Sequence, residues 1–216
     1  MKLLIFDFDG TIADSLEVFI EATNHLAQRY GYPPIEAHQI SKIRSLSSRE
    51  LIQQIPVARW QLPFFLRRLR QEVRELSPKL QVFDGISEAL IELEQEYCLG
   101  IVTSNAKTTV ENVLRGQELD PLFQFIHAGH GLLGKARILK RLLKQYGLQP
   151  TEVIYIGDET RDIEAAQQVQ LATIAVSWGF NNRVVLEQQQ PDIIIDHPSE
   201  LFTAIKQFQG LMLPRS

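Results

Sequence analysis

The sequence is poor in cysteine, in long apolar runs and in excess charge, and each scarcity excludes a class of protein. Its 216 residues include one cysteine, Cys98, which rules out an intrachain disulfide and a cysteine-rich metal site and fits a reducing, cytoplasmic location. Because no run of about 18 apolar residues is present, we predict no membrane-spanning helix. The net charge of −4 gives no sign of a nucleic-acid-binding protein.

The composition that remains is that of a globular protein with an uneven distribution of charge. Hydrophobic residues make up 44% of the chain and charged residues 22%, which is ordinary for a protein with a sizeable core. Residues 15–81 hold ten Lys/Arg and six Asp/Glu, a net of +4, whereas the rest of the chain has a net of −8. This asymmetry fits either solvated helix faces or two parts of which one binds anions.

Short apolar runs rich in β-branched residues recur along the chain. They are Leu3–Phe6, Leu99–Val102, Phe123–Ile126, Val153–Ile156, Ala172–Val176 and Ile193–Ile195. Amphipathic helical patterns separate most of these runs, and one of the patterns is stopped by Gly147. Continuously apolar strands that alternate with helices predict an α/β fold, with a doubly wound parallel-sheet (Rossmann-like) core covered by helices on both faces.

The alternation fails between the first strand and Val82, where only helical signals occur. Three helices are predicted here. An amphipathic stripe marks the first at Leu16–Tyr30, and the capping box Ser47-x-x-Glu50 begins the second. A proline in the first turn, Pro63, begins the third, which runs to about Leu76. We therefore predict an all-helical cap at residues 15–81. It is inserted into a catalytic α/β core that consists of residues 1–14 and 82–216.

Two carboxylates follow the first predicted strand directly. Asp7 and Asp9 are two residues apart in an extended segment, so both face the same way. In open parallel sheets, ligands bind beyond the carboxyl ends of the strands. Two carboxylates at such a short separation repel each other unless a proton or a cation lies between them. Because carboxylate oxygens suit Mg²⁺, which commonly binds phosphate as well, the pair predicts a magnesium and phosphate site.

Polar residues also follow two of the later strands. Thr103, Ser104 and Asn105 offer small donors that could hold phosphate oxygens, although hydroxyl residues at strand ends are common in turns. Asp158 and Asp162 follow Val153–Ile156 at a spacing of four, with one carboxylate at the strand tip and one in the next helical turn. Acids at a helix start are frequent in any case, because they cap the helix and suit its dipole.

A glycine-rich run, Gly129–Ala136, offers a competing interpretation as a nucleotide-binding loop. It matches GxGxxG and nearly matches a P-loop. Ala136 nevertheless stands where a P-loop needs Ser or Thr on Mg²⁺, and the run follows a late strand instead of the first βα turn. We therefore do not expect nucleotide binding here. The five histidines show no metal-ligand spacing either.

Taken together, the motifs resemble those of the haloacid dehalogenase-like hydrolases, and all four occur in order. They are Asp7–Ser15, Ile101–Asn105, Gly134-Lys135, and Gly157-Asp158 through Asp162. A helical insert directly after the first motif resembles the subfamily that includes phosphoglycolate phosphatase-like and β-phosphoglucomutase-like members. The dehalogenases themselves share the fold but lack the second acid and the metal, so Asp9 separates this chain from them.

The resemblance implies a role for each motif residue. Asp7 is the nucleophile that becomes an aspartyl phosphate, and Asp9 protonates the leaving oxygen and then activates water. Thr103 and Lys135 hold the phosphoryl oxygens. The metal ligands implied for Mg²⁺ are Asp7, the Asp9 backbone carbonyl and Asp158, with Asp162 and Glu159 supporting them from outside. Carboxylate nucleophiles and charge neutralisation by a metal and a lysine suit phosphoryl transfer.

The expected partner is a small phosphorylated metabolite, and the expected function is that of a Mg²⁺-dependent phosphatase. Arg44 and Arg49 lie where the substrate loop of the cap falls in this family, so either could bind the substrate, or both could be exposed loop arginines. A sugar phosphomutase shares the four motifs and stays an alternative. A catalytically silent binding module is disfavoured because Asp7, Asp9, Lys135 and Asp158 are all retained. The chain could be a monomer or a homodimer.

Overall fold

The core of the protein is a six-stranded parallel sheet. The structure, a computed structural model, describes residues 2–55, 57–58, 60–129 and 134–212. The strand order is β5-β4-β1-β6-β7-β8, and each neighbouring pair is parallel. The strands are β1 (Leu3–Phe6), β4 (Cys98–Val102), β5 (Phe123–His127), β6 (Val153–Gly157), β7 (Ala172–Val176) and β8 (Ile193–Ile195). The prediction of a parallel α/β sheet from the six apolar runs is confirmed.

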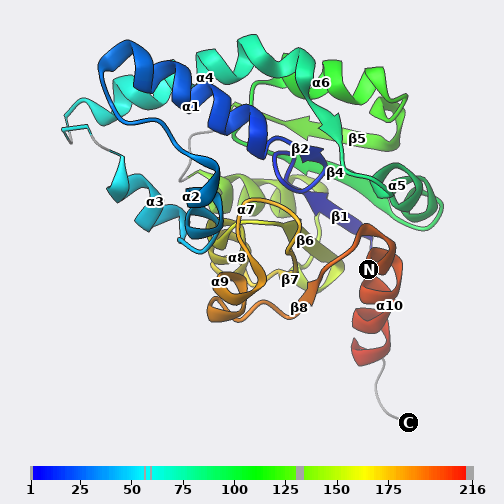
Figure 1. Cartoon of the computed structure of the whole chain (residues 1–216). Helices are drawn as coiled ribbons and strands as arrows, with labels where there is room; N and C mark the ends of the chain where they lie inside the picture. The colour runs from blue at the N-terminus through cyan, green and yellow to red at the C-terminus, as the bar shows by residue number, and fades with distance from the viewer. Residues whose placement is uncertain (1, 56, 59, 130–133, 213–216) are drawn as a thin grey trace.

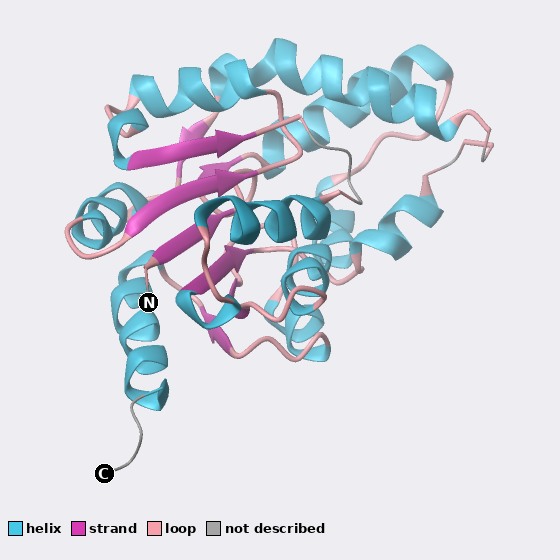
Figure 2. Cartoon of the chain, turned by 180° about the vertical axis from the view of Figure 1, so that it is seen from behind, coloured by secondary structure: helices cyan, strands magenta, loops and turns pink. Residues whose placement is uncertain are grey.

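Helices cover both faces of this sheet (Figures 1 and 2). Alternate residues of β1 face opposite sides, since Leu4 and Phe6 belong to one buried cluster and Leu3 and Ile5 to the other. The first cluster is closed by α5 (Ile86–Glu94), α6 (Lys107–Gly116) and α10 (Leu201–Met212). The opposite face is covered by α7 (Lys135–Tyr146), α8 (Thr160–Gln167) and α9 (Arg183–Gln188).

Four further helices are inserted between two short strands. These strands, β2 (Ala13–Asp14) and β3 (Gln81–Val82), pair with each other antiparallel. The helices are α1 (Leu16–Tyr30), α2 (Ala37–Arg44), α3 (Ser48–Gln54) and α4 (Leu62–Leu76). They have a small core of their own, formed by Ala22, Leu26, Phe65 and Leu69. In Figure 2 the strand arrows point towards the side of the molecule that carries the insert.

The insert differs from the sequence-based expectation in two details. Helix α2 was not predicted, because it contains no buried residue and so has no apolar periodicity; a capping box between Glu36 and Gln39 starts it instead. The insert is also not wholly helical, since Gln81 pairs with Asp14 in the short sheet. The boundaries of the cap at residues 15 and 81 stay a prediction.

The remaining elements are short 3₁₀ turns that precede strands or helices, at Ser77–Lys79, Asp120–Leu122, Pro150–Glu152 and Pro198–Glu200. Within the part of the chain that the structure describes, no helix is long and apolar enough to cross a membrane. Of the glycine-rich run that resembled a nucleotide loop, residues 130–133 lie outside the described residues.

Candidate active site

The acidic and polar motifs meet at the carboxyl ends of three adjacent strands. Asp7 follows β1, Thr103 follows β4 and Asp158 follows β6, and β1 lies between the other two strands. The chain crosses from β1 to one side of the sheet through β4 and β5, and to the other side through β6, β7 and β8. Ligands of open parallel sheets bind at such a change of direction.

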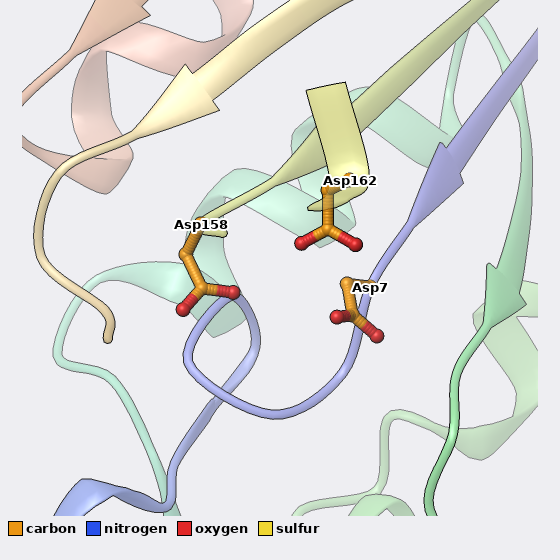
Figure 3. A group of neighbouring side chains, drawn as sticks. All are labelled: Asp7, Asp158 and Asp162. Atoms are coloured by element: carbon orange, nitrogen blue, oxygen red, sulfur yellow. The ribbon is translucent and has the colours of Figure 1, made fainter. Parts of the chain in front are cut away.

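Three buried carboxylates converge there (Figure 3). One carboxylate oxygen each of Asp7, Asp158 and Asp162 lie within 4.8 Å of one another. Asp7 comes from the end of β1, Asp158 from the end of β6 and Asp162 from the first turn of α8. Each is exposed by 2% or less. The cluster thus joins two acids that the resemblance implied as metal ligands, Asp7 and Asp158, with Asp162, for which it implied a supporting role.

Hydrogen bonds fix the direction of each carboxylate in the cluster. The backbone N–H of Phe8 donates to Asp7 Oδ1 at 2.7 Å. Asp158 accepts from the Thr11 hydroxyl at 2.8 Å and from the backbone N–H of Phe180 at 2.7 Å. Asp162 accepts from the backbone N–H of Glu159 at 3.1 Å and so closes the N-terminus of α8.

Two glycines allow the surrounding loops to approach Asp158 closely. Gly10 has a φ of +75°, and a Cβ atom there would lie 2.0 Å from Asp158 Oδ2. A Cβ atom at Gly179 would lie 2.2 Å from the Gly10 carbonyl oxygen and 2.3 Å from the same carboxylate. Real Cβ atoms cannot come so near, so the loops after β1 and β7 can enclose this carboxylate only with glycine at both positions.

Lys135 brings a buried positive charge into the cluster. Its Nζ lies 2.5 Å from Asp7 Oδ2 and also pairs with Asp162 Oδ1, and the side chain is 4% exposed. Lys135 is the first residue of α7, after Gly134. Burial opposes the charge of Lys135, but Asp162 and Asp7 keep its pKa above the ordinary value. The ammonium therefore stays charged and can neutralise a phosphoryl oxygen.

Burial also sets the protonation of the acids. It raises the pKa of Asp7 to about 7, although the Lys135 ammonium opposes the shift. Burial raises the pKa of Asp158 well above its ordinary value, and the charges of Glu159, Asp162 and Asp7 raise it further. Without a bound cation, therefore, burial and mutual repulsion favour the protonated forms of Asp7 and Asp158.

This donor set fits a divalent metal ion. Three buried carboxylates that repel one another offer hard oxygen ligands within reach of a single ion, and a cation would relieve their repulsion. Asp7 and Asp158 are two of the three metal ligands that the family resemblance implied. The side chain of Asp9 is not in this group, and the expected ligand from that residue is its backbone carbonyl.

The other expected site residues lie around Asp7. Asp9 is half-buried and its Oδ1 accepts from the Asn105 amide at 2.9 Å. Burial raises the pKa of Asp9, against the effect of the Asn105 hydrogen bond. Thr103 is buried and its hydroxyl accepts from the backbone N–H of Asn105 at 3.1 Å, while Ser104 between them is half-buried. The strand end after β4 thus lies directly beside the second acid.

The cap contacts the core through the start of α3. The Ser48 hydroxyl donates to Glu159 Oε2 at 2.8 Å, and the Ser48 backbone N–H donates to the Thr160 hydroxyl at 3.2 Å. The Asn181 amide donates to the Leu46 carbonyl at 2.7 Å, and its oxygen accepts from the Thr160 backbone N–H. Glu159, expected to support the metal ligands, thus joins the cap to the core.

The two cap arginines are already bound to the core. Arg44 ends α2, is half-buried, and donates to the Ser177 carbonyl at 2.9 Å. Arg49, in the first turn of α3, pairs with Glu164 of α8 at 2.8 Å, and its side chain is 73% exposed. Neither arginine therefore lies in a loop. Their expected contact with the substrate stays a prediction.

Arg161 is a charged residue near the site to which the sequence analysis assigned no role. Its guanidinium pairs with Glu159 and is largely buried, with 16% of the side chain exposed. Burial opposes its charge, but Glu159, Asp162 and Asp7 hold its pKa above the ordinary value. The only sequence signal was an arginine between Asp158 and Asp162, which looks like any polar residue in the first turn of a helix.

The chain matches known proteins over most of its length. The family described as haloacid dehalogenase-like hydrolase matches residues 4–176. A phosphoglycolate phosphatase from Synechococcus elongatus is 40% identical over 96% of this chain and 98% of its own. An N-acetylmuramic acid 6-phosphate phosphatase from Pseudomonas aeruginosa is 27% identical over 95% of both chains.

A haloacid dehalogenase-like family protein from Streptococcus pneumoniae has the same fold. The two structures superpose with a TM-score of 0.82 over 95% of this chain and 98% of that one, at 24% sequence identity. The fold, the four motifs and the relatives of this chain agree, and the chain belongs to the haloacid dehalogenase-like hydrolases, as a phosphatase of their phosphoglycolate phosphatase-like branch.

Proposed function

We propose that this protein is a Mg²⁺-dependent phosphatase that hydrolyses 2-phosphoglycolate through an aspartyl-phosphate intermediate. The observation that carries the substrate is the 40% identity, over 96% of the chain, to a phosphoglycolate phosphatase. The chemistry is supported by the buried Asp7 carboxylate, which pairs with Lys135 and lies close to Asp158 and Asp162 at the carboxyl ends of the strands. The single cysteine favours the cytoplasm as the place of action.

In the first step, a carboxylate oxygen of Asp7 attacks phosphorus and the bond from phosphorus to the ester oxygen breaks. The departing oxygen takes a proton from Asp9, so glycolate leaves as an alcohol. Asp9 suits this task because burial raises its pKa, which favours the protonated form that a general acid needs. Asn105, which donates to Asp9, orients the carboxyl group.

In the second step, water attacks the phosphorus of the aspartyl phosphate and gives its proton to the Asp9 carboxylate. Inorganic phosphate leaves, Asp7 is regenerated, and Asp9 is protonated again for the next turnover. Lys135, already paired with Asp7, neutralises a phosphoryl oxygen in both steps, and Thr103 and Ser104 supply further donors. Asp7, the Asp9 carbonyl and Asp158 would hold Mg²⁺, which supplies charge neutralisation to the phosphoryl group.

The proposal is tested by measuring phosphate release from a panel of compounds in the presence of Mg²⁺. The panel contains 2-phosphoglycolate, a sugar phosphate, inorganic pyrophosphate and N-acetylmuramic acid 6-phosphate, of which the last two are suggested by the names of relatives. We expect the highest kcat/KM on 2-phosphoglycolate. A preference for another compound would reject the substrate, and an isomerised sugar phosphate without free phosphate would indicate a phosphomutase.

A further inference from the structure

Arg161 combines burial, positive charge and unused donors beside the catalytic acids. It lies in the first turn of α8, between Asp158 and Asp162. Of the three guanidinium nitrogens, the terminal Nη2 pairs with Glu159 Oε1. The other terminal nitrogen, Nη1, and the inner nitrogen, Nε, are buried and have no hydrogen-bond partner among the described residues. A buried donor without an acceptor is costly, and a guanidinium holds carboxylates and phosphates well.

The two buried cations of the site differ in how far their donors are used. Lys135 is already bound by Asp7, at 2.5 Å, and by Asp162. Arg161 follows Asp158 by three residues and directly precedes Asp162, and two of its nitrogens have no partner among the described residues. A further anionic group that enters the site would therefore find its free donors on Arg161.

The two cap arginines are less suited to this position. Arg49 is mostly exposed and is neutralised by Glu164. Arg44 donates to the Ser177 carbonyl, and its charge acts on Asp14 of the short sheet. The Nε of Arg44 is also buried without a hydrogen-bond partner among the described residues. Arg161 differs from Arg44 and Arg49 in having two such nitrogens and in lying in the first turn of α8, between Asp158 and Asp162.

We propose that Arg161 binds the second anionic group of the substrate, a carboxylate joined closely to the phosphoester oxygen. This inference rests on the proposed phosphatase function and names the residue that selects its substrate class. A carboxylate one carbon from the ester oxygen, as in 2-phosphoglycolate, stays near Asp9 during the reaction. Glu159 acts as a positioning residue, since it holds the guanidinium with one oxygen and the cap residue Ser48 with the other.

The position of Glu159 also explains how the substrate would reach Arg161. Cap and core are joined at this carboxylate, because Ser48 of α3 donates to it. The free nitrogens of Arg161 are buried while this contact is in place, so a substrate would reach them only if Ser48 separated from Glu159. Restoring the contact afterwards would shield the new ion pair from water, which would strengthen it.

The test compares two non-hydrolysable ligands, phosphonoacetate, which carries a carboxylate, and methylphosphonate, which does not. Calorimetry on the Mg²⁺-loaded protein gives the ratio of their affinities, which does not depend on turnover. For the wild type we expect a ratio of roughly ten to a hundred in favour of phosphonoacetate, the usual effect of a charge-assisted contact. In Arg161→Gln the ratio should fall to about one. The matched control is Arg183→Gln, which removes a surface arginine paired with Glu187 and Asp196 and should keep the ratio.

Two further variants distinguish loss of the arginine contact from loss of the folded structure. Arg161→Gln leaves the buried Glu159 without its cationic partner, so the double variant Glu159→Gln/Arg161→Gln removes both charges together and should also lose the ratio. Arg161→Lys keeps the charge but not the planar group, and we expect an intermediate ratio. Thermal unfolding of each variant shows which of them are folded.

Several results would overturn the inference. One is a ratio that persists in both Arg161→Gln and the double variant, and another is an equal loss of affinity for both ligands. A ratio that disappears in Arg49→Ala but not in Arg161→Gln would transfer the role to the cap. In all three cases, phosphate release from 2-phosphoglycolate by the wild type would leave the proposed function intact. A wild-type ratio near one, with no such release, would reject the carboxylated substrate as well.

Discussion

The Nζ of Lys135 lies 2.5 Å from Oδ2 of Asp7, and both side chains are almost fully buried. A buried carboxylate alone would keep its proton, because burial disfavours the charged form. The ammonium favours the ionised, nucleophilic form of Asp7, and the two effects together leave its pKa at about 7. The nucleophile is thus poised to ionise fully once a further cation enters the cluster.

The first prediction concerns Asp7 as the nucleophile. Asp7→Asn keeps the size of the side chain but removes the attacking charge, so kcat should fall at least about a thousandfold while the protein stays folded. Acid quenching of the wild type during turnover, followed by peptide mass analysis, should find the phosphoryl group on Asp7. Phosphoryl label on another residue, or full activity of the variant, would exclude the covalent mechanism.

The second prediction is a strict metal requirement. Asp7, Asp158 and Asp162 form a cluster that would repel a phosphate dianion, so excess chelator should abolish phosphate release and Mg²⁺ should restore it. Ca²⁺ should inhibit, because its larger and more flexible coordination shell can admit a second carboxylate oxygen and displace the nucleophile. Titration of chelated protein with each ion, read as phosphate release, checks both statements. Undiminished activity in excess chelator would reject the metal site.

The third prediction links stability to pH in the metal-free protein. The pKa of Asp7 is about 7 in the folded state and near 4 in an unfolded chain. Between these values the folded state binds more protons than the unfolded state, so this carboxyl group makes the free energy of unfolding decrease as pH rises. The variant Asp7→Asn provides the reference, because the amide that replaces the carboxyl group does not titrate.

Relative to Asp7→Asn, the wild type should therefore lose on the order of 2 kcal/mol between about pH 5 and pH 8. Thermal unfolding of both proteins in chelator, at several pH values, measures this difference. Mg²⁺ should stabilise the wild type more at the higher pH, since it binds ionised carboxylates. A constant difference in Tm across this range would show that the pKa of Asp7 is not raised.

The local parts of the site could be predicted from the sequence because each follows a strand that can be recognised by itself. Asp7, Thr103 and Asp158 all stand at strand ends, and the parallel sheet brings such ends together. Contacts between distant segments could not be predicted in this way. The bond from Ser48 to Glu159 joins residues 111 positions apart, and no local pattern encodes it.

The same limit applies to Asp162 and Arg161. The family resemblance implied a supporting role for Asp162, whereas its bond to Lys135 depends on how α7 and α8 pack on the same face of the sheet. Arg161 looked like a polar residue on a helix surface, and only the tertiary structure buries it. Helix α2 was missed for the opposite reason, because a helix with no buried residue leaves no apolar pattern.

The fourth prediction distinguishes two roles for Arg49. From the sequence, we expected an arginine of the cap to bind the substrate, in which case Arg49→Ala should impair hydrolysis of 2-phosphoglycolate and spare a small aryl phosphate. The ion pair with Glu164 favours a role in holding the cap on the core. We therefore expect a loss of no more than about fivefold in kcat/KM, because an exposed pair contributes only about 0.2–1 kcal/mol.

This loss should be the same for both substrates, and Glu164→Ala should reproduce it because either change removes the same contact. In the double variant the two effects should not add, since the second substitution has no pair left to break. Steady-state kinetics of the four proteins on both substrates measure the coupling. A loss confined to 2-phosphoglycolate in Arg49→Ala, and absent from Glu164→Ala, would instead mean that the arginine leaves Glu164 to bind the carboxylate during turnover.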